Sequence, residues 1–351
     1  MVYKFPAMRG MQAKSEYYVC MIPLGVLAKI FADDSSDALP EFRAQRKLNE
    51  IRIPEIRDYI LNNRNSYVFS ALAASVDGNI RFLAVPLSSN IGELEIDMDA
   101  VFLINDGQHR KAAIIKAVAI DETLKNETIA VVLYKDRGLE RSQQMFTDLN
   151  KHAVNASKSL NTLYDSKDPL ALLTKQLVNE IPFFCKYTDK EKDNPAKYAA
   201  KFFTLNMFYD ANQRIIKSPE NSKDELEFLV AFWGNVVRYM RDWNDMDNGN
   251  LSKKDLRELY ISTQGVTIHA FGKLGHYLYC HKEIDMEKGL QGLTAVDWMR
   301  SNLNCWKNRA ITGTGRINRN EKGIFLTYVQ IKRLLGLKIE KDESAKENQI
   351  L

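Results

Sequence analysis

Up to about residue 155, the chain alternates short apolar runs with stretches of helical spacing. Apolar runs of strand length predict strands over residues 17–24, 66–76, 101–104 and 128–134. Apolar residues three and four positions apart predict helices over residues 24–31 and 53–63. The run at 101–104 is apolar on both faces, which is typical of a central strand, and the Asp77-Gly78 pair predicts a β-hairpin. Strands separated by helices indicate an α/β or α+β domain.

Beyond this point the pattern becomes helical. Apolar residues recur at three- and four-residue spacing over residues 159–165, 169–184, 197–216, 224–243, 253–261 and 269–284. Strand-like runs nearly vanish, so this part is expected to be all helical. The sequence therefore predicts an α+β fold, with a mixed α/β domain at 1–158, a helical domain at 159–340 and a charged, frayed tail at 341–351.

Composition narrows the class of protein. A chain of 351 residues is long enough for two domains, and 45% hydrophobic residues are enough for a sizeable core. No apolar run approaches the roughly 18 residues that span a bilayer, and the N-terminal segment lacks the features of a signal peptide. The four cysteines are widely scattered, which favours reduced thiols. We therefore expect a cytoplasmic protein without a membrane span.

Positive charge is concentrated late in the chain. Between Arg300 and Lys338, nine Lys and Arg residues stand against one acid, Glu321. A local basic surface suggests a polyanion such as DNA as the partner, and a solvated basic face without a partner is the alternative. We expect DNA contacts from cations that flank a Gly/Thr loop or lie on the helix after it. These are Lys307, Arg309, Arg316, Arg319, Lys332 and Arg333.

A polar motif, Asn-Asp-Gly-Gln-His-Arg at residues 105–110, joins the apolar run 101–104 to an alanine-rich helical pattern. Asp106 is expected to cap the helix, and Gly107 permits a tight turn. His109 and Arg110 would then lie in the first turn, where cations are unfavourable by a few tenths of a kcal/mol or more. Two interpretations remain open: the turn receives an anion such as phosphate, or Arg110 forms an internal salt bridge.

In the first interpretation, the residues 106–110 form an anion site. Arg110 is the main charged ligand, Gln108 adds a neutral donor and His109 adds a pH-sensitive one. Asp106 caps the helix and does not touch the anion. Replacing Arg110 with alanine is then expected to abolish nucleotide or DNA-backbone binding while the fold stays intact.

The motif resembles the signature of the DGQHR-domain family, whose best-known branch is the DndB family of bacterial DNA phosphorothioation (DNA sulfur modification) clusters. Residues 143–160, Gln-Gln-Met-Phe-Thr-Asp-Leu-Asn and the positions after them, resemble a second block of that family, with Asn150 in register. An amide at Asn150 could bond a loop backbone or a ligand. The length of the chain and its mixed-then-helical layout agree with this resemblance.

The N-terminal part also resembles the ParB/sulfiredoxin fold, in which a strand–Gly-[Glu/Gln]-[Arg/His]-Arg–helix unit holds a nucleotide phosphate. Residues 107–110 match that pattern position by position. ParB-type CTPases carry a Glu and an Arg before their second block, where this chain has Ser142 and Phe146. The resemblance therefore implies phosphate or DNA-backbone binding, without implying CTP specificity or metal-assisted hydrolysis.

These resemblances imply a DNA-binding regulator of a phosphorothioation gene cluster, acting as a transcriptional repressor on double-stranded DNA. The alternative is a ParB/sulfiredoxin-type nucleotide hydrolase or nucleotide-gated switch, with weak ATPase activity and ATP or another nucleotide as ligand. The expected protein partners are other proteins of the sulfur-modification system or further copies of this chain. His276 and Cys280 share a helical spacing, but no paired close ligands accompany them, so no metal or iron–sulfur cluster is expected.

Overall fold

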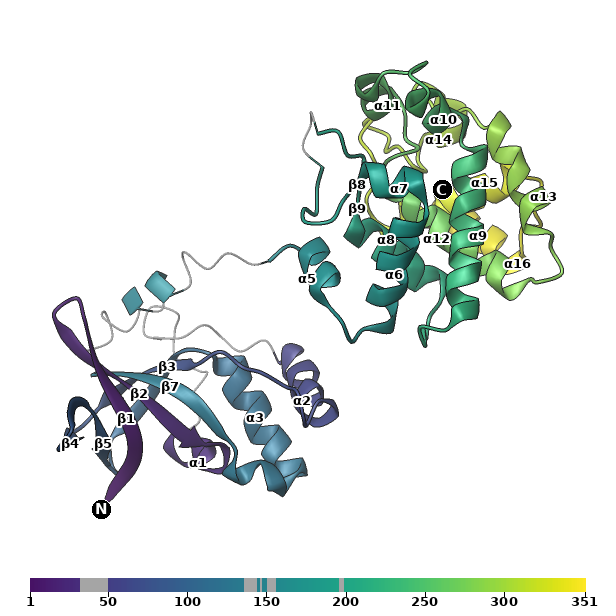
Figure 1. Cartoon of the computed structure of the whole chain (residues 1–351). Coiled ribbons are helices and arrows are strands. Elements are labelled where there is room, and N and C mark those ends of the chain that lie inside the picture. Colours follow the sequence, from purple (N-terminus) through teal and green to yellow (C-terminus); the bar gives the residue numbers. More distant parts are fainter. Residues whose placement is uncertain (32–49, 136–143, 146, 150–155, 196–198) are drawn as a thin grey trace. The chain divides into compact units, whose positions relative to one another are not determined.

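The structure is a computed structural model that describes residues 1–31, 50–135, 144–145, 147–149, 156–195 and 199–351. Its internal contacts divide the chain into two compact units, Met1–Val154 and Asn155–Leu351 (Figure 1). The first unit is rich in strands and the second is helical, which confirms the predicted α+β class.

A seven-stranded mixed sheet forms the first unit. Its strands are β1 (Val2–Gln12), β2 (Ser15–Pro23), β3 (Leu72–Asp77), β4 (Ile80–Val85), β5 (Ser88–Asp97), β6 (Val101–Asp106) and β7 (Thr128–Lys135). They lie in the order β4-β5-β1-β2-β7-β3-β6, and β3 and β7 are parallel. Since β3 and β7 are parallel, a crossover must connect them, and that path carries the helix after β6.

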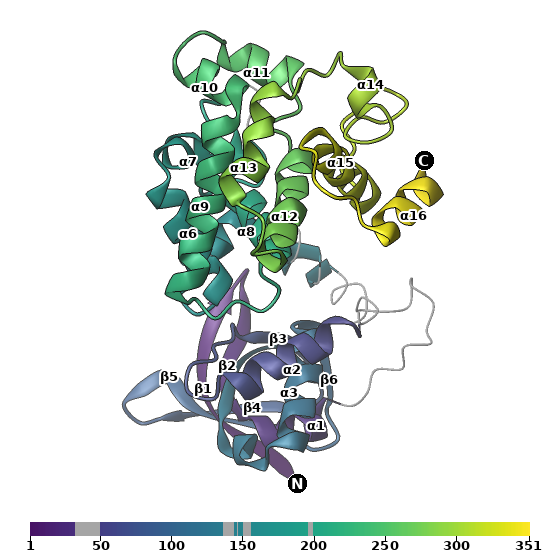
Figure 2. The ribbon, with the colours of Figure 1, turned by 90° about the vertical axis from the view of Figure 1, so that its right-hand side faces the viewer.

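Three helices lie together beside this sheet (Figures 1 and 2). They are α1 (Leu24–Ile30), α2 (Arg52–Asn62) and α3 (Gln108–Ile120), and a short 3₁₀ helix, η2 (Glu122–Asn126), follows them. Both α1 and α2 pack on α3. Buried aliphatic side chains from the helices and strands form one core, including Leu27, Ile60 and Ile114, each at most 1% exposed. This packing holds the start of α3 firmly against the sheet.

Two details of the predicted sheet are wrong. Among the described strands, β6 pairs with β3 alone and lies at an edge, and Val101 at its start is 65% exposed. Asp77-Gly78 does not close a hairpin, because β3 pairs with β6 and β7 while β4 pairs with β5. A four-residue apolar run is too short to distinguish a central strand from an edge strand, and a turn sequence does not determine which strands pair.

The second unit is a helical assembly around several buried aromatic residues, including Trp233, Trp243 and Trp306. Its helices are α5 (Lys158–Tyr164), α6 (Pro169–Glu180), α7 (Pro182–Tyr187), α8 (Leu205–Ile215), α9 (Lys223–Tyr239), α10 (Arg241–Asp247), α11 (Lys253–Leu259), α12 (Gly265–Cys280), α13 (Met286–Gln291), α14 (Leu303–Trp306), α15 (Glu321–Leu334) and α16 (Lys341–Ile350), with a short 3₁₀ helix, η3 (Gly292–Ala295), after α13. A parallel pair of two-residue strands, β8 (Thr188–Asp189) and β9 (Phe203–Thr204), departs from the all-helical prediction.

Helix α12 lies between α8 and α15 and contacts both (Figure 2). The approach to α8 is close, since a Cβ atom on Gly272 would come within 2.6 Å of the Ala211 carbonyl oxygen. Glycine at this position therefore permits backbone-to-backbone packing that any larger residue would prevent. The packing of α12 against α8 and α15 therefore fixes the position of the helix in the unit.

The charged tail predicted at 341–351 is not frayed, which corrects that expectation. Residues Lys341–Ile350 form α16, and its N-terminus carries a capping box in which Glu340 and Glu343 bond each other's backbone amides. Two acidic side chains of α16 turn toward α15, and Glu347 is only 4% exposed. The sequence shows a charged segment but not its partner, which is the basic side of α15.

Candidate functional site

The motif at 105–110 forms the tight turn from β6 into α3. Gly107 precedes the helix with a φ of 99°, in the left-handed region that favours glycine. A Cβ atom on Gly107 would lie 2.4 Å from Leu72 Cδ2 and 3.2 Å from Arg110 Nη2. The predicted strand–turn–helix placement of the motif is therefore correct, and glycine is required in the turn.

Asp106 does not cap α3, contrary to the prediction. The residue before the helix is Gly107, which has no side chain to bond the first backbone amides of α3. The Asp106 carboxylate instead accepts a hydrogen bond from Arg110, with 2.7 Å between Oδ2 and Nη2. Because Asp106 is the last residue of β6 and Arg110 lies in the first turn of α3, this ion pair spans the connection.

Arg110 is bound inside the protein. Its Nη1 atom donates to the Ser70 carbonyl oxygen at 2.7 Å, to the Ser70 hydroxyl at 2.6 Å and to the Ala71 carbonyl oxygen at 2.9 Å. The side chain of Arg110 is 17% exposed. These contacts match the second interpretation of the motif, the internal salt bridge. That Arg110 also binds an anion stays a prediction.

Two amide groups near the turn have no partner among the described residues. Asn105 is fully buried and accepts a hydrogen bond from the Ser75 hydroxyl at 2.9 Å, but its Nδ2 group has no hydrogen-bond partner in that part of the chain. Gln108 is 8% exposed, and its Nε2 group likewise has no hydrogen-bond partner among the described residues. A buried donor left unpaired costs about 1–3 kcal/mol, so two of them beside one helix N-terminus indicate a place for an acceptor.

Two residues of the predicted anion site remain, His109 and Asn150. His109 is partly exposed and makes contacts of its own. Lys111, which follows Arg110, is 7% exposed. Asn150 lies outside the described residues, although Asp148 of the same block is described and accepts a 2.6 Å hydrogen bond from Gln144.

Four basic side chains of the second unit are exposed before or at the start of α15. They are Lys307, Arg316, Arg319 and Lys322, and within the described residues no carboxylate lies within 4 Å of their charged groups. The loop between them is tight, with Gly315 at a φ of 80° and a 2.8 Å bond from the Thr312 amide to the Arg316 carbonyl. Such a loop presents its cations outward.

Lys332 was predicted to contact DNA, and this is wrong. Its side chain has no exposed surface. The ammonium group bonds Glu343 of α16 at 2.8 Å and lies 3.6 Å from the centre of the Tyr277 ring. A group enclosed by a carboxylate and an aromatic ring cannot reach a phosphate.

The other two cations of this cluster, Arg309 and Arg333, share one carboxylate. Glu347 accepts from Arg309 Nη1 at 2.5 Å and from Arg333 Nη2 at 2.6 Å. Arg309 is 14% exposed, while Arg333 is 45% exposed. Helix α16 thus neutralises much of the charge excess that the sequence places between residues 300 and 338.

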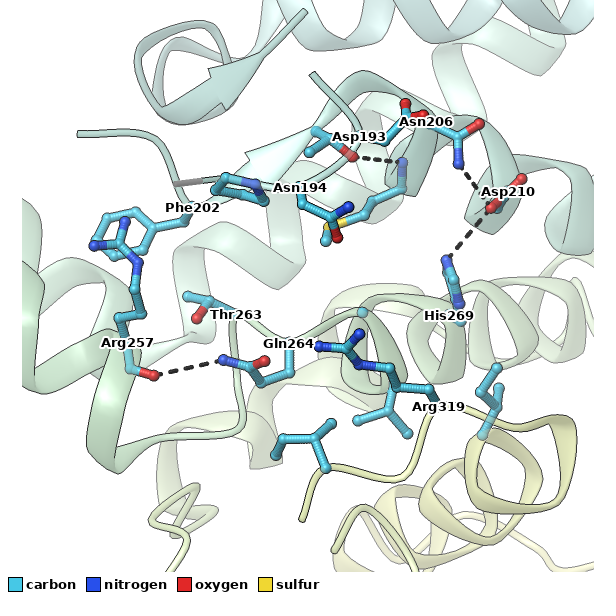
Figure 3. A pocket seen from close by; sticks show the side chains of 17 residues that line it. Asp193, Asn194, Phe202, Asn206, Asp210, Arg257, Thr263, Gln264, His269 and Arg319 are labelled. Carbon is cyan, nitrogen blue, oxygen red and sulfur yellow. Dashed lines mark hydrogen bonds and ion pairs between the residues drawn. The ribbon is translucent and has the colours of Figure 1, made fainter. Parts of the chain in front are cut away.

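A cavity of about 390 Å³ at the start of α12 was not predicted from the sequence. Its walls include Asp210, Thr263, Gln264, His269 and Arg319 (Figure 3). Of these residues, only Arg319 is named in the sequence analysis, as a DNA contact. A usable signal would have been Thr-Gln-Gly before a long apolar helix, since it offers no conventional N-cap side chain for the first amides.

Membrane-spanning helices and metal-binding clusters were both considered for the described part of the chain. None of its helices combines the length and the apolar character needed to cross a membrane. Nor do three His, Cys, Asp or Glu side chains gather there in an arrangement that could hold a metal ion.

Comparison with known proteins gives one positive result. A family model described as DndB, DNA-sulfur modification-associated, matches residues 5–338. Neither the curated proteins nor the solved structures give a match, so the likeness of the first unit to the ParB/sulfiredoxin fold stays a prediction. The family match extends over both units and over the motif at 105–110, and on that basis the chain belongs to the DndB family of DNA-sulfur modification-associated proteins.

Proposed function

We propose that this protein binds double-stranded DNA through the exposed cations that precede α15 and represses transcription of a DNA sulfur-modification gene cluster. The observation that carries the proposal is the exposure of Lys307, Arg316, Arg319 and Lys322 without nearby carboxylates in the described residues. Cations that are already paired gain little from a phosphate, whereas unpaired ones release counterions from DNA and gain affinity. Family membership supports a part in the sulfur-modification system.

The loop adds donors that suit phosphate oxygens. The Thr312 and Thr314 hydroxyls lie 3.0 Å apart at its exposed end, and the backbone amide of Gly313 stands between them in the sequence. Hydroxyl and backbone N–H contacts to phosphates position a protein on the duplex without reading its sequence. We therefore expect this loop to supply affinity for DNA of any sequence, and promoter choice to come from other contacts.

Replacing Lys307, Arg316 and Lys322 together with alanine should weaken binding to duplexes of any sequence. The slope of log K against log salt should become flatter by about three units, roughly 0.9 for each lost phosphate contact. Fluorescence anisotropy on a fixed duplex between low and high salt measures this slope.

A matched control removes equal charge elsewhere in the same unit. Lys223, Lys254 and Lys282 are exposed and lie on other segments, so their triple alanine variant should keep the parental slope. Equal slopes in the two triple variants would show that the segment before α15 does not face DNA. Repression itself is tested with a reporter behind the promoter of the protein's own gene cluster.

A second candidate function is binding of ATP or another nucleotide at the start of α3, with weak hydrolysis as the enzymatic form. The specific observation in its favour is the pair of unpartnered donors, Asn105 Nδ2 and Gln108 Nε2, beside an uncapped helix N-terminus. Helix N-termini with free amides favour phosphate groups. The internal bonding of Arg110 counts against a large contribution from that residue.

Replacing Gln108 with leucine separates the two roles of this turn. If the amide meets a nucleotide, affinity for ATP or CTP should fall about three- to tenfold, the worth of one neutral hydrogen bond. The folded state should be no less stable, because the change removes an unpartnered buried donor. Equilibrium binding and thermal unfolding are measured on the same samples. Unchanged affinity for both nucleotides would eliminate Gln108 as a ligand.

A further inference from the structure

The cavity beside α12 has two chemically different sides. Figure 3 shows Thr263, Gln264 and Arg319 around the beginning of α12, with Asn206, Asp210 and His269 on the other side. Phe202, Met207 and Ile317 supply apolar wall. A volume of about 390 Å³ lies at the lower end of the range of ligand pockets, roughly 300–1,000 Å³.

The first side is rich in unsatisfied donors. Gln264 precedes α12, a 16-residue helix, and its side chain makes no hydrogen bond to the first amides of that helix. Thr263 is 4% exposed, and within the described residues its hydroxyl has no hydrogen-bond partner. The helix dipole adds partial positive charge at the same point. The Thr263 hydroxyl and the amides of Gly265 and Val266 can therefore donate to a ligand, whereas the Thr267 amide already bonds the Gln264 carbonyl oxygen at 2.9 Å.

Arg319 completes this side with a full charge. It belongs to the loop before α15, and in Figure 3 its guanidinium reaches toward Gln264. No carboxylate of the described residues lies within 4 Å of it. Because the guanidinium presents a planar fork of donors, it suits a phosphate group held against the helix N-terminus.

The opposite side offers an acceptor. Asp210 receives a 3.0 Å hydrogen bond from the Asn206 amide, and its Oδ2 atom lies 3.9 Å from His269 Nε2. His269 Nε2 is buried and makes no hydrogen bond with the described residues. Burial, followed by the charge of Arg214, lowers the pKa of His269 below its usual value, so the ring is neutral near pH 7. The free acceptor capacity of Asp210 suits a hydroxyl or amino group.

We propose that this cavity binds a phosphate-bearing small molecule of mononucleotide size, with its phosphate at the start of α12. Arg319, Thr263 and the first amides of α12 hold the phosphate, and Asp210 accepts from a hydroxyl or amino group at the other end. The apolar wall covers the part of the ligand between them. This site lies within the helical unit and is independent of the turn before α3.

The test uses the full chain, with AMP and inorganic phosphate as probes in isothermal titration calorimetry. Arg319→Ala should weaken AMP binding about tenfold or more, and Thr263→Val about three- to tenfold. Arg241→Ala is the matched control: it removes an arginine of the same unit that is 76% exposed and does not line the cavity, and AMP binding should be unchanged. Inorganic phosphate should compete with AMP.

Three results would overturn the proposal. The first is that the parent chain binds neither AMP nor inorganic phosphate. The second is that both Arg319→Ala and Thr263→Val bind AMP with the affinity of the parent chain. The third is that Gln108→Leu loses AMP binding while Arg319→Ala keeps it, which would place the ligand at α3. Thermal unfolding of each variant without ligand shows whether the fold is retained. Arg319 and Thr263 are replaced in separate variants, so that the proposal can be tested even if only one of them folds.

Discussion

Replacing Arg110 with alanine should lower the free energy of unfolding of the first unit by about 3 kcal/mol, because charge-assisted hydrogen bonds are worth about 1.5–3 kcal/mol each and solvent replaces some of them. The change leaves the Ala71 carbonyl without this donor and Asp106 without its cation. Hydrogen exchange followed at the amides of α3 and β3 measures the loss in the unit where it occurs.

Arg81→Ala provides the matched control for Arg110. Arg81 belongs to the same sheet unit, has a side chain that is 75% exposed and lies 4.0 Å from Glu95. Its removal should change stability by less than about 0.5 kcal/mol, as for most exposed positions. If Arg110→Ala kept the stability of the parent and lost nucleotide or DNA binding, the anion interpretation of the motif would be correct after all.

Replacing Glu347 with alanine should destabilise the second unit by about 3–5 kcal/mol, the cost of removing one member of a buried ion pair. Arg309 and Arg333 both donate to this carboxylate, and Arg309 is largely buried. Without Glu347, Arg309 keeps its charge and loses its counter-ion. Thermal or urea unfolding monitored by tryptophan fluorescence measures the effect, since all four tryptophans lie in this unit.

Asp342→Ala is the control on the same helix, because Asp342 is exposed and forms no ion pair with the described residues.

The pH dependence of stability provides a second test of Glu347. Burial alone would raise the pKa of Glu347, but hydrogen bonds from Arg333 and Arg309 lower it below 4.5. The stability from these bonds is therefore present above pH 4.5 and is lost as pH falls through the lowered pKa. Similar acid unfolding of the parent and Glu347→Ala would contradict this role.

The sequence predicted the strands and helices with clear periodicity and missed those without it. The strands at β2, β6 and β7 were predicted because each contains a continuous apolar run. Strand β1 was missed because Pro6, Gly10 and several polar residues interrupt its pattern. It forms because it pairs along nearly its whole length with β5 and β2. Its hairpin to β2 turns through Ala13 and Lys14, both at positive φ, without the usual Asn-Gly signal.

The turn before α3 and the basic segment before α15 were predicted in position, whereas the cavity beside α12 was not. An apolar run followed by Asp-Gly and a helical pattern was sufficient to place the turn before α3. Besides the nearby Asp106, the acceptors of Arg110 come from residues 40 and 39 positions earlier, and no local pattern shows that these face it. Likewise, nothing in the sequence of α16 indicates that Glu343 lies against Lys332. Pairing between distant residues depends on tertiary packing, which local periodicity does not contain.

The order of strands in the sheet has a consequence for synthesis of the chain. Strand β1 pairs with β5, about ninety residues later, and β2 pairs with β7, which ends at Lys135. The first unit cannot complete its sheet on the ribosome until β7 has emerged, so β2 waits with an unpaired edge during elongation. Contacts of high sequence separation also fold slowly. The N-terminal half, although made first, is thus the part most exposed to misassembly and most dependent on the pace of translation.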